Sequence, residues 1–439
     1  MDIQKLYNER IISVDKALSF IKSDDEIVSA LGAAEPRGIV SRIHEVGDRV
    51  KNVTVVTCLP MGGYEYFQNP KYKDRIQMEG WFYSPEIRKA HKNRNVSFIP
   101  NHLHLAAERR LDYKRPNIFI GTASPMDKHG YISLSLSATY EREMLEHAEI
   151  TILEVNPNMP RTFGDTVIHI SEIDYLIEQD YELPELPITQ PSEKDQLIGK
   201  HIVDLVEDGS TIQLGIGGIP NAVASELKTK KNLGIHTEMF TDGMVELFKS
   251  GAITNNEKTL MPGKMVATFA LGSKVLYDFI DDNPAVQILR GRWVNDPNVI
   301  GKNHKMVSIN TTIEIDLTGQ CASESIGHRQ FSGTGGQADT AIGAQICKEG
   351  KSIIALYSTT KVKDPETGER KTISKIVPNL TVGAAVTLSR NDVDYVVTEY
   401  GVASLRGTPL KERVKRLIGI AHPDFKEDLK ASAKELMIW

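Results

Sequence analysis

The sequence has few cysteines, no long apolar run and no stripe of positive charge. Its three cysteines, Cys58, Cys321 and Cys347, lie far apart and are odd in number, which argues against a disulfide framework or a Cys-x-x-Cys zinc site. Apolar stretches such as Ile353 to Tyr357 are too short to cross a bilayer. Charged residues stand at the very start, with no apolar run behind them. We therefore expect a cytoplasmic protein with no signal peptide and no membrane association.

The charge balance points to small-molecule partners. The formal net charge is −6, and the Lys and Arg residues are scattered along the chain. A nucleic-acid-binding protein needs a basic patch or stripe, so nucleic acid is excluded as a partner. With 439 residues, of which 40% are hydrophobic and 25% charged, the composition is that of a globular protein with more than one core.

The main domain boundary is predicted near residue 186. The segment YELPELPITQ, from Tyr181 to Gln190, holds two prolines three residues apart and has neither helical nor alternating periodicity, which is typical of an extended linker. We expect an N-terminal α/β domain over residues 1–186. A second α/β domain over residues 187–439 would then carry the candidate reactive residue described below.

The two halves resemble each other in pattern. When Pro36 is set against Pro220, a helical face, a break and a buried strand follow one another in the same order in both halves. A small further change of offset brings Cys58 against Glu238. The sequence therefore predicts two related α/β units in tandem, only one of which carries the reactive group.

A first glycine motif runs from Gln213 to Val223, with the sequence QLGIGGIPNAV. A strand that leads through glycines into a helix presents backbone N–H groups and a positive dipole end, which attract phosphate or a developing oxyanion. The alternative is a tight turn that needs glycine only for its geometry. A dinucleotide fingerprint fits poorly, because Pro220 stands where glycine or alanine is required.

A second glycine motif lies between Gln330 and Asp339, and its Gly333, Gly335 and Ala338 match the spacing G-x-G-x-x-A. The residues before it are polar and do not form a buried strand, and no acid that would bind a ribose follows at the required distance. We therefore expect a loop whose backbone approaches a ligand closely, and no NAD site.

Glu238 is the candidate reactive carboxylate. It follows a short predicted strand and precedes a predicted helix, and the carboxyl ends of strands in α/β folds are where ligand-facing residues lie. The alternative is a surface or helix-capping acid.

At this point the sequence resembles the acetyl-CoA hydrolase and transferase family, and within it the 4-hydroxybutyrate CoA-transferases. The matching motifs cover nearly the whole chain in order: Glu79-Gly-Trp-Phe, Glu154-Val-Asn-Pro, Gly164-Asp-Thr-Val-Ile-His-Ile-Ser-Glu-Ile-Asp, Gln213-Leu-Gly-Ile-Gly, His236-Thr-Glu, Phe331-Ser-Gly-Thr-Gly-Gly-Gln, Tyr395-Val-Val-Thr-Glu-Tyr-Gly and Ala421-His-Pro-Asp-Phe-Lys. The resemblance implies two NagB-like (Rossmann-like) α/β domains.

The resemblance also implies roles for individual residues. Glu238 would become a glutamyl-CoA thioester, and the N–H groups of Ala34 and Gly336 would hold the thioester oxygen, with Ala33 matching the same loop as Ala34. Polar side chains that would meet a hydroxylated acyl chain are Gln213, Gln337 and His104. The residues implied to bind CoA are Gly215, Ile216, Gly217, Gly218, Ile219, Gly335, Gly336, Ser358 and Lys361.

The implied reaction moves CoA from 4-hydroxybutyryl-CoA or butyryl-CoA to acetate or another carboxylate by ping-pong chemistry. A glutamate is already ionised near neutral pH, so no general base is required. Coenzyme A would be a substrate, with no permanently bound cofactor, and the resemblance implies a homo-oligomer. The alternatives are an acyl-CoA hydrolase, which admits water, and a CoA-binding sensor without catalysis.

Two histidines raise the question of a metal. His102 and His104 would lie on one face of a possible strand, a spacing that suits metal ligation. No third ligand stands nearby in the sequence, so we expect no metal and interpret the pair as satisfied or substrate-lining histidines.

Overall fold

The computed structural model describes residues 2–187, 189–364 and 367–439. The chain forms two compact units. The first contains the chain up to Pro187 together with Thr237–Asp242 and Lys264–Asn295, and the second contains the remaining segments. The predicted pair of α/β domains is confirmed. The segment with Glu238, however, packs in the first unit, whereas the sequence assigned it to the second domain.

The first unit is built on a seven-stranded sheet in which every pairing is parallel. In the order β10-β7-β5-β1-β2-β3-β4, the strands are β10 (Tyr175–Glu178), β7 (Ile150–Val155), β5 (Ile118–Ala123), β1 (Glu26–Ser29), β2 (Val53–Thr57), β3 (Ile76–Gly80) and β4 (Val96–Phe98). The residues of β1 and β5 are all buried, as expected of parallel strands covered on both faces.

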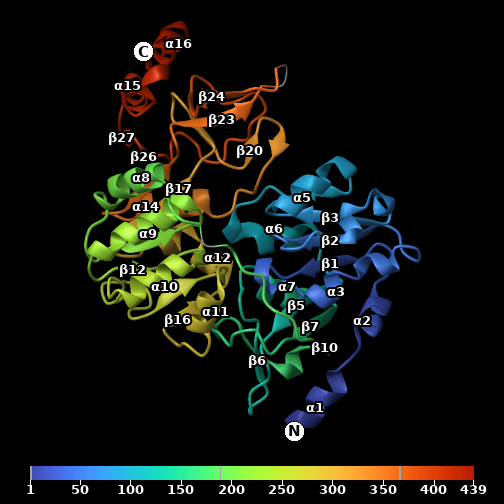
Figure 1. Ribbon diagram of the computed structural model, residues 1–439. Coiled ribbons are helices and arrows are strands. Elements are labelled where there is room, and N and C mark those ends of the chain that lie inside the picture. Colours follow the sequence, from blue (N-terminus) through green and yellow to red (C-terminus); the bar gives the residue numbers. More distant parts are fainter. Residues whose placement is uncertain (1, 188, 365–366) are drawn as a thin grey trace. The chain divides into compact units, whose positions relative to one another are not determined.

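Helices and one large apolar cluster cover this sheet. The helices of the first unit are α1 (Ile3–Arg10), α2 (Val14–Phe20), α3 (Arg37–Val40), α4 (Glu65–Gln68), α5 (Pro85–Ala90), α6 (Ala106–Tyr113), α7 (Glu141–His147), α11 (Lys274–Ile280) and α12 (Gly291–Val294). Figure 1 shows α5, α6 and α7 beside the strands in blue and teal. Leu18 of α2, Ile39 of α3 and Ile87 of α5 pack in one buried cluster with strand residues such as Val55 and Ile120, which buries apolar area and stabilises the layers.

The second unit has a six-stranded sheet with one antiparallel edge strand. In the order β12-β11-β17-β22-β26-β27, the strands are β12 (Gly234–Ile235), β11 (Thr211–Leu214), β17 (Met306–Thr311), β22 (Lys351–Ala355), β26 (Tyr395–Thr398) and β27 (Gly401–Ser404). Its helices are α8 (Glu193–Val203), α9 (Gly218–Glu226), α10 (Asp242–Lys249), which starts at the last residue of a first-unit segment, α13 (Pro297–Ile300), α14 (Gln337–Ile346), α15 (Leu410–Gly419) and α16 (Lys426–Glu435). Helices α8 and α9 lie side by side, in green in Figure 1.

The strand order repeats between the units. Strands β10-β7-β5-β1-β2 of the first unit correspond one for one, in order along the chain, to β26-β22-β17-β11-β12 of the second. In the first unit β1 lies between β2 and β5, and in the second unit β11 lies between β12 and β17, so the strand order reverses at β1 and at β11. Ligands of open α/β sheets bind at the carboxyl end of the strands at such a reversal. The loops that follow β1 and β11 therefore lie at equivalent, favourable positions.

Small sheets complete both units. In the first unit they are β6 (Tyr131–Ser133) with β9 (Val167–His169), β13 (Met239–Phe240) with β15 (Phe269–Ala270), and β14 (Met265–Ala267), β16 (Val286–Ile288) and β8 (Phe163–Gly164) in one sheet. In the second unit they are β18 (Glu314–Asp316) with β19 (Cys321–Ala322) and β25 (Ile376–Val377), β20 (Ser325–Ile326) with β21 (Arg329–Gln330), and β23 (Thr359–Lys363) with β24 (Arg370–Ser374).

We predict that the buried ion pair of Arg110 supports the first unit. Its guanidinium lies 2.6 Å from Glu26 and 2.7 Å from Glu79, and the side chains of Arg110 and Glu26 are 5% and 1% exposed. Arg110→Met leaves the Glu26 charge buried and unpaired, which should cost roughly 3–5 kcal/mol in the free energy of urea unfolding. Arg109→Met is the matched control, because Arg109 is 60% exposed and pairs with Asp112 only at the surface. Equal losses in both variants would contradict the prediction.

Candidate active site

Glu238 is a half-buried residue whose backbone is held by strands of the first unit. The N–H of Thr237 donates to the carbonyl of Val266 at 2.9 Å, and the N–H of Thr268 donates to the carbonyl of Glu238 at 2.9 Å. Strand β13 then continues beside β15. These backbone hydrogen bonds carry the chain out of the second unit directly after β12 and place the carboxylate among first-unit residues.

Asn295 is a polar neighbour of Glu238 that no motif in the sequence indicated. Its side-chain amide donates to Oε2 of Glu238 at 3.0 Å, and the residue is fully buried. It follows the last turn of α12, where its N–H donates to Gly291 at 2.9 Å. A Cβ on Gly291 would lie 2.6 Å from the carbonyl oxygen of Thr139, so glycine allows the close packing that positions this short helix. Asn295 therefore orients one oxygen of the carboxylate.

Cys58, which the sequence aligned with Glu238 across the two halves, lies in the same neighbourhood. The thiol is buried. Burial first, and then the negative charges of Glu238 and Glu141, raise its pKa well above the ordinary value. Since a thiol is nucleophilic only when ionised, Cys58 is an inert, protonated neighbour of Glu238.

The loop after β1 is a single 3₁₀ turn, Gly32–Ala34, that lies next to Cys58. The N–H of Gly32 donates to the carbonyl of Cys58 at 3.2 Å. The N–H of Ala34, predicted to hold the thioester oxygen, instead donates to the carbonyl of Leu31 at 2.9 Å within the turn. The N–H of the buried Ala33 has no hydrogen-bond acceptor among the residues that the structure describes. Of the two alanines, Ala33 is thus the one with a donor to offer.

In the second unit, the loop Gly215 to Ile219 leads from β11 into α9. Gly217 has φ of +117° and precedes the helix, a conformation that other residues rarely adopt. A Cβ on Gly215 would meet no atom within 4 Å, so packing does not require glycine there. Ile216 and Gly217 are exposed. The backbone at Ile216 and Gly217 is thus exposed directly before the start of α9.

The second predicted loop ends at α14. Gly335 has φ of +54°, and Gly336 immediately precedes the helix. Gln337 is buried at the first helical position, where its Nε2 donates to the carbonyl of Thr311 at 2.7 Å. Its Oε1 is buried without a partner among the described atoms. The main chain at Gly336 therefore lies next to Gln337, whose side-chain oxygen accepts no hydrogen bond from the described atoms.

Gln213 and Ser358 have structural partners. The amide oxygen of Gln213 accepts from Ser308 Oγ at 3.2 Å and from Ile309 N–H at 3.1 Å. The N–H and hydroxyl of Ser358 both donate to the carboxylate of Glu399, at 2.8 and 2.9 Å. Ser358 is fully buried, so its position does not suit the predicted contact with a CoA phosphate.

Lys361 is exposed, and His104 is half-buried. Lys361 is exposed on β23, which forms a hairpin with β24. His104 lies in a 3₁₀ turn, Leu103–Leu105, and not on a strand as the spacing suggested. Its ring lies 6.2 Å from that of His102. Within the described ranges, no group of three or more His, Cys, Asp or Glu is arranged to hold a metal ion.

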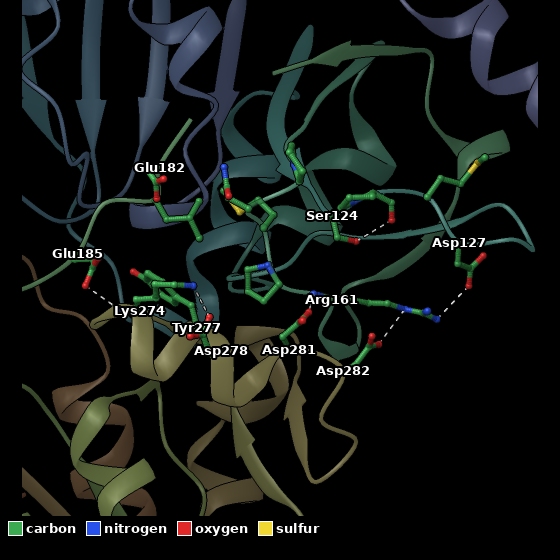
Figure 2. Close-up of a pocket in the computed structure, with 17 residues that line it drawn as sticks. Ser124, Asp127, Arg161, Glu182, Glu185, Lys274, Tyr277, Asp278, Asp281 and Asp282 are labelled. Atoms are coloured by element: carbon green, nitrogen blue, oxygen red, sulfur yellow. Dashed lines mark hydrogen bonds and ion pairs between the residues drawn. The ribbon is translucent and has the colours of Figure 1, made fainter. Parts of the chain in front are cut away.

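A cavity of about 440 Å³ lies elsewhere in the first unit, at the carboxyl ends of β5, β7 and β10 and against α11. The guanidinium of Arg161 lies 3.1 Å from Asp127 and 3.7 Å from Asp282, and Figure 2 shows it between these two carboxylates. The acidic residues that line it are Asp127, Glu182, Glu185, Asp278, Asp281 and Asp282, against Arg161 and Lys274 as bases. This excess of negative charge disfavours phosphate, so the cavity is not a site for the phosphates of CoA.

Models of both domains of one family match this chain. The acetyl-CoA hydrolase/transferase N-terminal domain matches residues 1–186, and the acetyl-CoA hydrolase/transferase C-terminal domain matches residues 272–433. The chain belongs to the acetyl-CoA hydrolase/transferase family. The family is named for hydrolysis or transfer at the thioester of acetyl-CoA.

Curated relatives and solved structures align with this family member over its whole length. It is 44% identical to a succinyl-CoA:cyclohexane-1-carboxylate CoA transferase from Geobacter metallireducens, over 99% of this chain and 97% of the relative. It is 42% identical to a 4-hydroxybutyrate coenzyme A transferase from Clostridium kluyveri, over 98% of both. The crystal structure of RipA from Yersinia pestis is 34% identical, with a TM-score of 0.93 and full coverage of both chains.

No helix among the described residues is long and apolar enough to cross a membrane. The three cysteines are buried free thiols.

The influence of Glu238 on Cys58 gives a test that does not depend on activity. In Glu238→Gln one of the two charges that raise the pKa of the Cys58 thiol is removed, so its pKa should fall and its alkylation by iodoacetamide at pH 9 should quicken, by about two- to tenfold for a change of up to one pKa unit. Cys321, whose pKa is raised by burial and Asp316, is the internal control. An equal change at both cysteines would mean that the substitution loosens the whole fold.

Proposed function

We propose that this protein transfers CoA from a short-chain acyl-CoA to a carboxylate, with Glu238 as the covalent nucleophile. One observation carries the proposal: the half-buried carboxylate of Glu238, in a member of this family, has one oxygen 3.0 Å from a buried amide donor. Curated relatives that align over 97% and 98% of their own length are named as CoA transferases, which favours transfer over hydrolysis.

The proposed chemistry needs no general base. Ionised Glu238 attacks the thioester carbonyl, the C–S bond breaks, and a mixed anhydride and CoA thiolate form. The thiolate then attacks the glutamyl carbonyl, so that the first carboxylate leaves and a glutamyl-CoA thioester remains. A second carboxylate attacks this thioester, and the same steps run in reverse to regenerate Glu238. Exclusion of water protects both intermediates from hydrolysis.

Two first-unit donors suit the oxyanions of these steps. The amide of Asn295 already contacts the Glu238 oxygen that would carry negative charge when the glutamyl carbonyl is attacked. The N–H of Ala33 lacks an acceptor among the described residues, and we propose it in place of Ala34. Donors of this kind are worth about 2.7–4 kcal/mol each in acyl transfer.

The second unit is proposed to bind CoA through backbone N–H groups at the starts of α9 and α14. The loop Gly215 to Ile219 and the pair Gly335 and Gly336 offer them to phosphates or to a developing oxyanion. Lys361 is exposed, so its ammonium group is accessible to a phosphate of CoA. Gln337, with its unmet acceptor, and His104 remain candidates for a hydroxylated acyl chain.

We propose 4-hydroxybutyryl-CoA or butyryl-CoA as donor and acetate as acceptor, in a cytoplasmic homo-oligomer without a permanent cofactor. The curated relatives are named for acyl groups as different as 4-hydroxybutyrate, succinate and cyclohexane-1-carboxylate. Initial rates across a panel of donors, with and without acetate, identify the acyl group. They also separate transfer from hydrolysis, because only a transferase requires the acceptor.

Replacement of Glu238 should abolish transfer. Glu238→Ala is expected to fold and to lose several orders of magnitude in turnover, because the covalent pathway disappears. In the wild type, acyl-CoA without an acceptor should leave CoA on the peptide that contains Glu238, and borohydride should reduce that thioester to an alcohol detectable by mass spectrometry. Glu238→Gln should show neither product. Retained exchange in Glu238→Ala would refute the covalent mechanism.

Removal of the amide that contacts Glu238 should slow turnover while the protein stays folded. Asn295→Ala is expected to lower kcat by about 100- to 1,000-fold, the usual loss for one oxyanion donor. Asn298→Ala is the matched control, because Asn298 is exposed and, among the described residues, its side chain hydrogen-bonds only to Asp296. If kcat in Asn295→Ala equals that of the control, the amide has no part in the reaction.

The loop after β11 can be tested without strain at Gly215. Because a Cβ there meets no atom within 4 Å, Gly215→Val should leave the unfolding midpoint unchanged and raise the KM for acyl-CoA by blocking approach of the ligand to the backbone. Gly419→Val is the control at a second glycine with open space around it. An unchanged KM would reduce this loop to a turn.

A further inference from the structure

Three buried carboxylates from different elements hold the segment Leu31 to Ile39, which contains Ala33. Oε1 of Glu141, at the start of α7, accepts from the N–H of Leu31 at 2.9 Å. Glu154, on β7, accepts from the N–H groups of Gly38 and Ile39, at 3.1 and 2.6 Å. Glu35, within the segment, accepts from the N–H of Met61 at 3.2 Å and from the hydroxyl of Tyr64. The exposed fractions of Glu35, Glu141 and Glu154 are 2%, 1% and 0%.

Glu154 is the one that binds two successive amides of the segment. Besides the two amides, its Oε2 accepts from the hydroxyl of Tyr181 at 2.8 Å. That hydroxyl in turn accepts from the N–H of Arg37 at 3.3 Å. A Cβ on Gly38 would lie 2.7 Å from Oε1 of Glu154, so glycine is needed for this close approach. One carboxylate thus accepts from two N–H groups in the first turn of α3, and the N–H of Ile39 also donates to the carbonyl of Pro36 at 3.2 Å.

A buried carboxylate is a costly way to satisfy backbone N–H groups, because burial disfavours its charge. A neutral side chain such as glutamine has only one acceptor atom. Its NH₂ group would face backbone N–H groups, and two donors cannot form a hydrogen bond with each other. The ionised form is therefore the one that fits all three donors. This segment needs such an anchor, because the 3₁₀ turn Gly32–Ala34 that presents the Ala33 N–H is a single turn.

We propose that Glu154 is a positioning residue for CoA transfer: its ionised carboxylate holds Gly38 and Ile39 and so fixes where the Ala33 N–H points. The proposal rests on the function given above and deepens it. Glu154 does not touch the reacting atoms. It acts through the main chain between Ile39 and Ala33.

The groups around Glu154 determine how its charge responds to pH. Burial raises its pKa to about 7, while the hydroxyl of Tyr181 and the amides of Gly38 and Ile39 lower it. The side chain of Gln179 packs on Gly38 from the same side. The charged groups nearby are Arg37, whose guanidinium lies 5.8 Å from the Tyr181 ring, and Glu35, whose pKa is also raised to about 7 by burial. As pH falls below about 7, Glu154 is protonated, loses an acceptor and releases the segment, so kcat should decline on the acid side.

Three variants separate positioning from bulk stability. Glu154→Gln should lower kcat by about 100-fold, the cost of a small misplacement of a catalytic group, and leave the KM for acyl-CoA unchanged. Tyr181→Phe removes a donor that stabilises the charge, so the pKa of Glu154 rises and the acid limb of kcat moves to higher pH. Glu178→Gln is the matched control, because Glu178 lies on the neighbouring strand β10 and accepts from Tyr7 at 3.2 Å without touching the segment.

Two further readouts assign the effect. The rate at which borohydride-trappable CoA forms on Glu238 should fall in Glu154→Gln and not in Glu178→Gln. Hydrogen–deuterium exchange of the peptide over residues 31–40 should quicken in Glu154→Gln alone. Tyr64→Phe removes the corresponding donor from Glu35 and should leave the acid limb in place.

The outcomes separate this inference from the proposed function. Absence of the CoA adduct in the wild type would overturn the function, and the positioning role with it. If the wild type forms the adduct but Glu154→Gln forms it at the same rate, the inference alone is overturned. An acid limb that moves in Tyr64→Phe and not in Tyr181→Phe would transfer the role to Glu35. A loss of kcat that is equal at every pH, with no shift in Tyr181→Phe, would leave Glu154 only a structural role.

Discussion

The candidate site depends on a short run of backbone hydrogen bonds. The N–H of Thr268 donates to the carbonyl of Glu238, and the N–H of Thr237 donates to Val266. These hydrogen bonds pair the chain after β12 with strands of the first unit. With this pairing, the carboxylate comes within reach of the Asn295 amide and of the thiol of Cys58.

Buried carboxylates give the first unit its distinctive electrostatics. Glu35, Glu141 and Glu154 each take up backbone N–H groups near the loop after β1, and burial raises the pKa of each. Glu26 and Glu79 are different, because the guanidinium of Arg110 pairs with both carboxylates. Ionised carboxylates at amide-lined positions bind main chain firmly, but they do so only while they stay charged.

Much of the fold could be predicted from local patterns. The strands that begin near Glu26 and Thr211 were visible as apolar runs after a helical face, and the structure has β1 and β11 there. The repeat between the halves was visible from Pro36 and Pro220, and the strand order confirms it. The 3₁₀ turn at His104 was not predictable, because two histidines two residues apart fit a strand as well as a turn.

By itself, the sequence determined the α/β class, the two glycine loops and Glu238 as the residue to examine, because glycine positions, apolar periodicity and motif order are local properties of the chain. Only the tertiary structure decided that Glu238 packs in the first unit and that Asn295 contacts it. It also decided that the N–H of Ala34 donates to the carbonyl of Leu31. These are contacts between residues distant in the chain or choices among neighbouring backbone donors, and no local pattern encodes which acceptor a given N–H will meet.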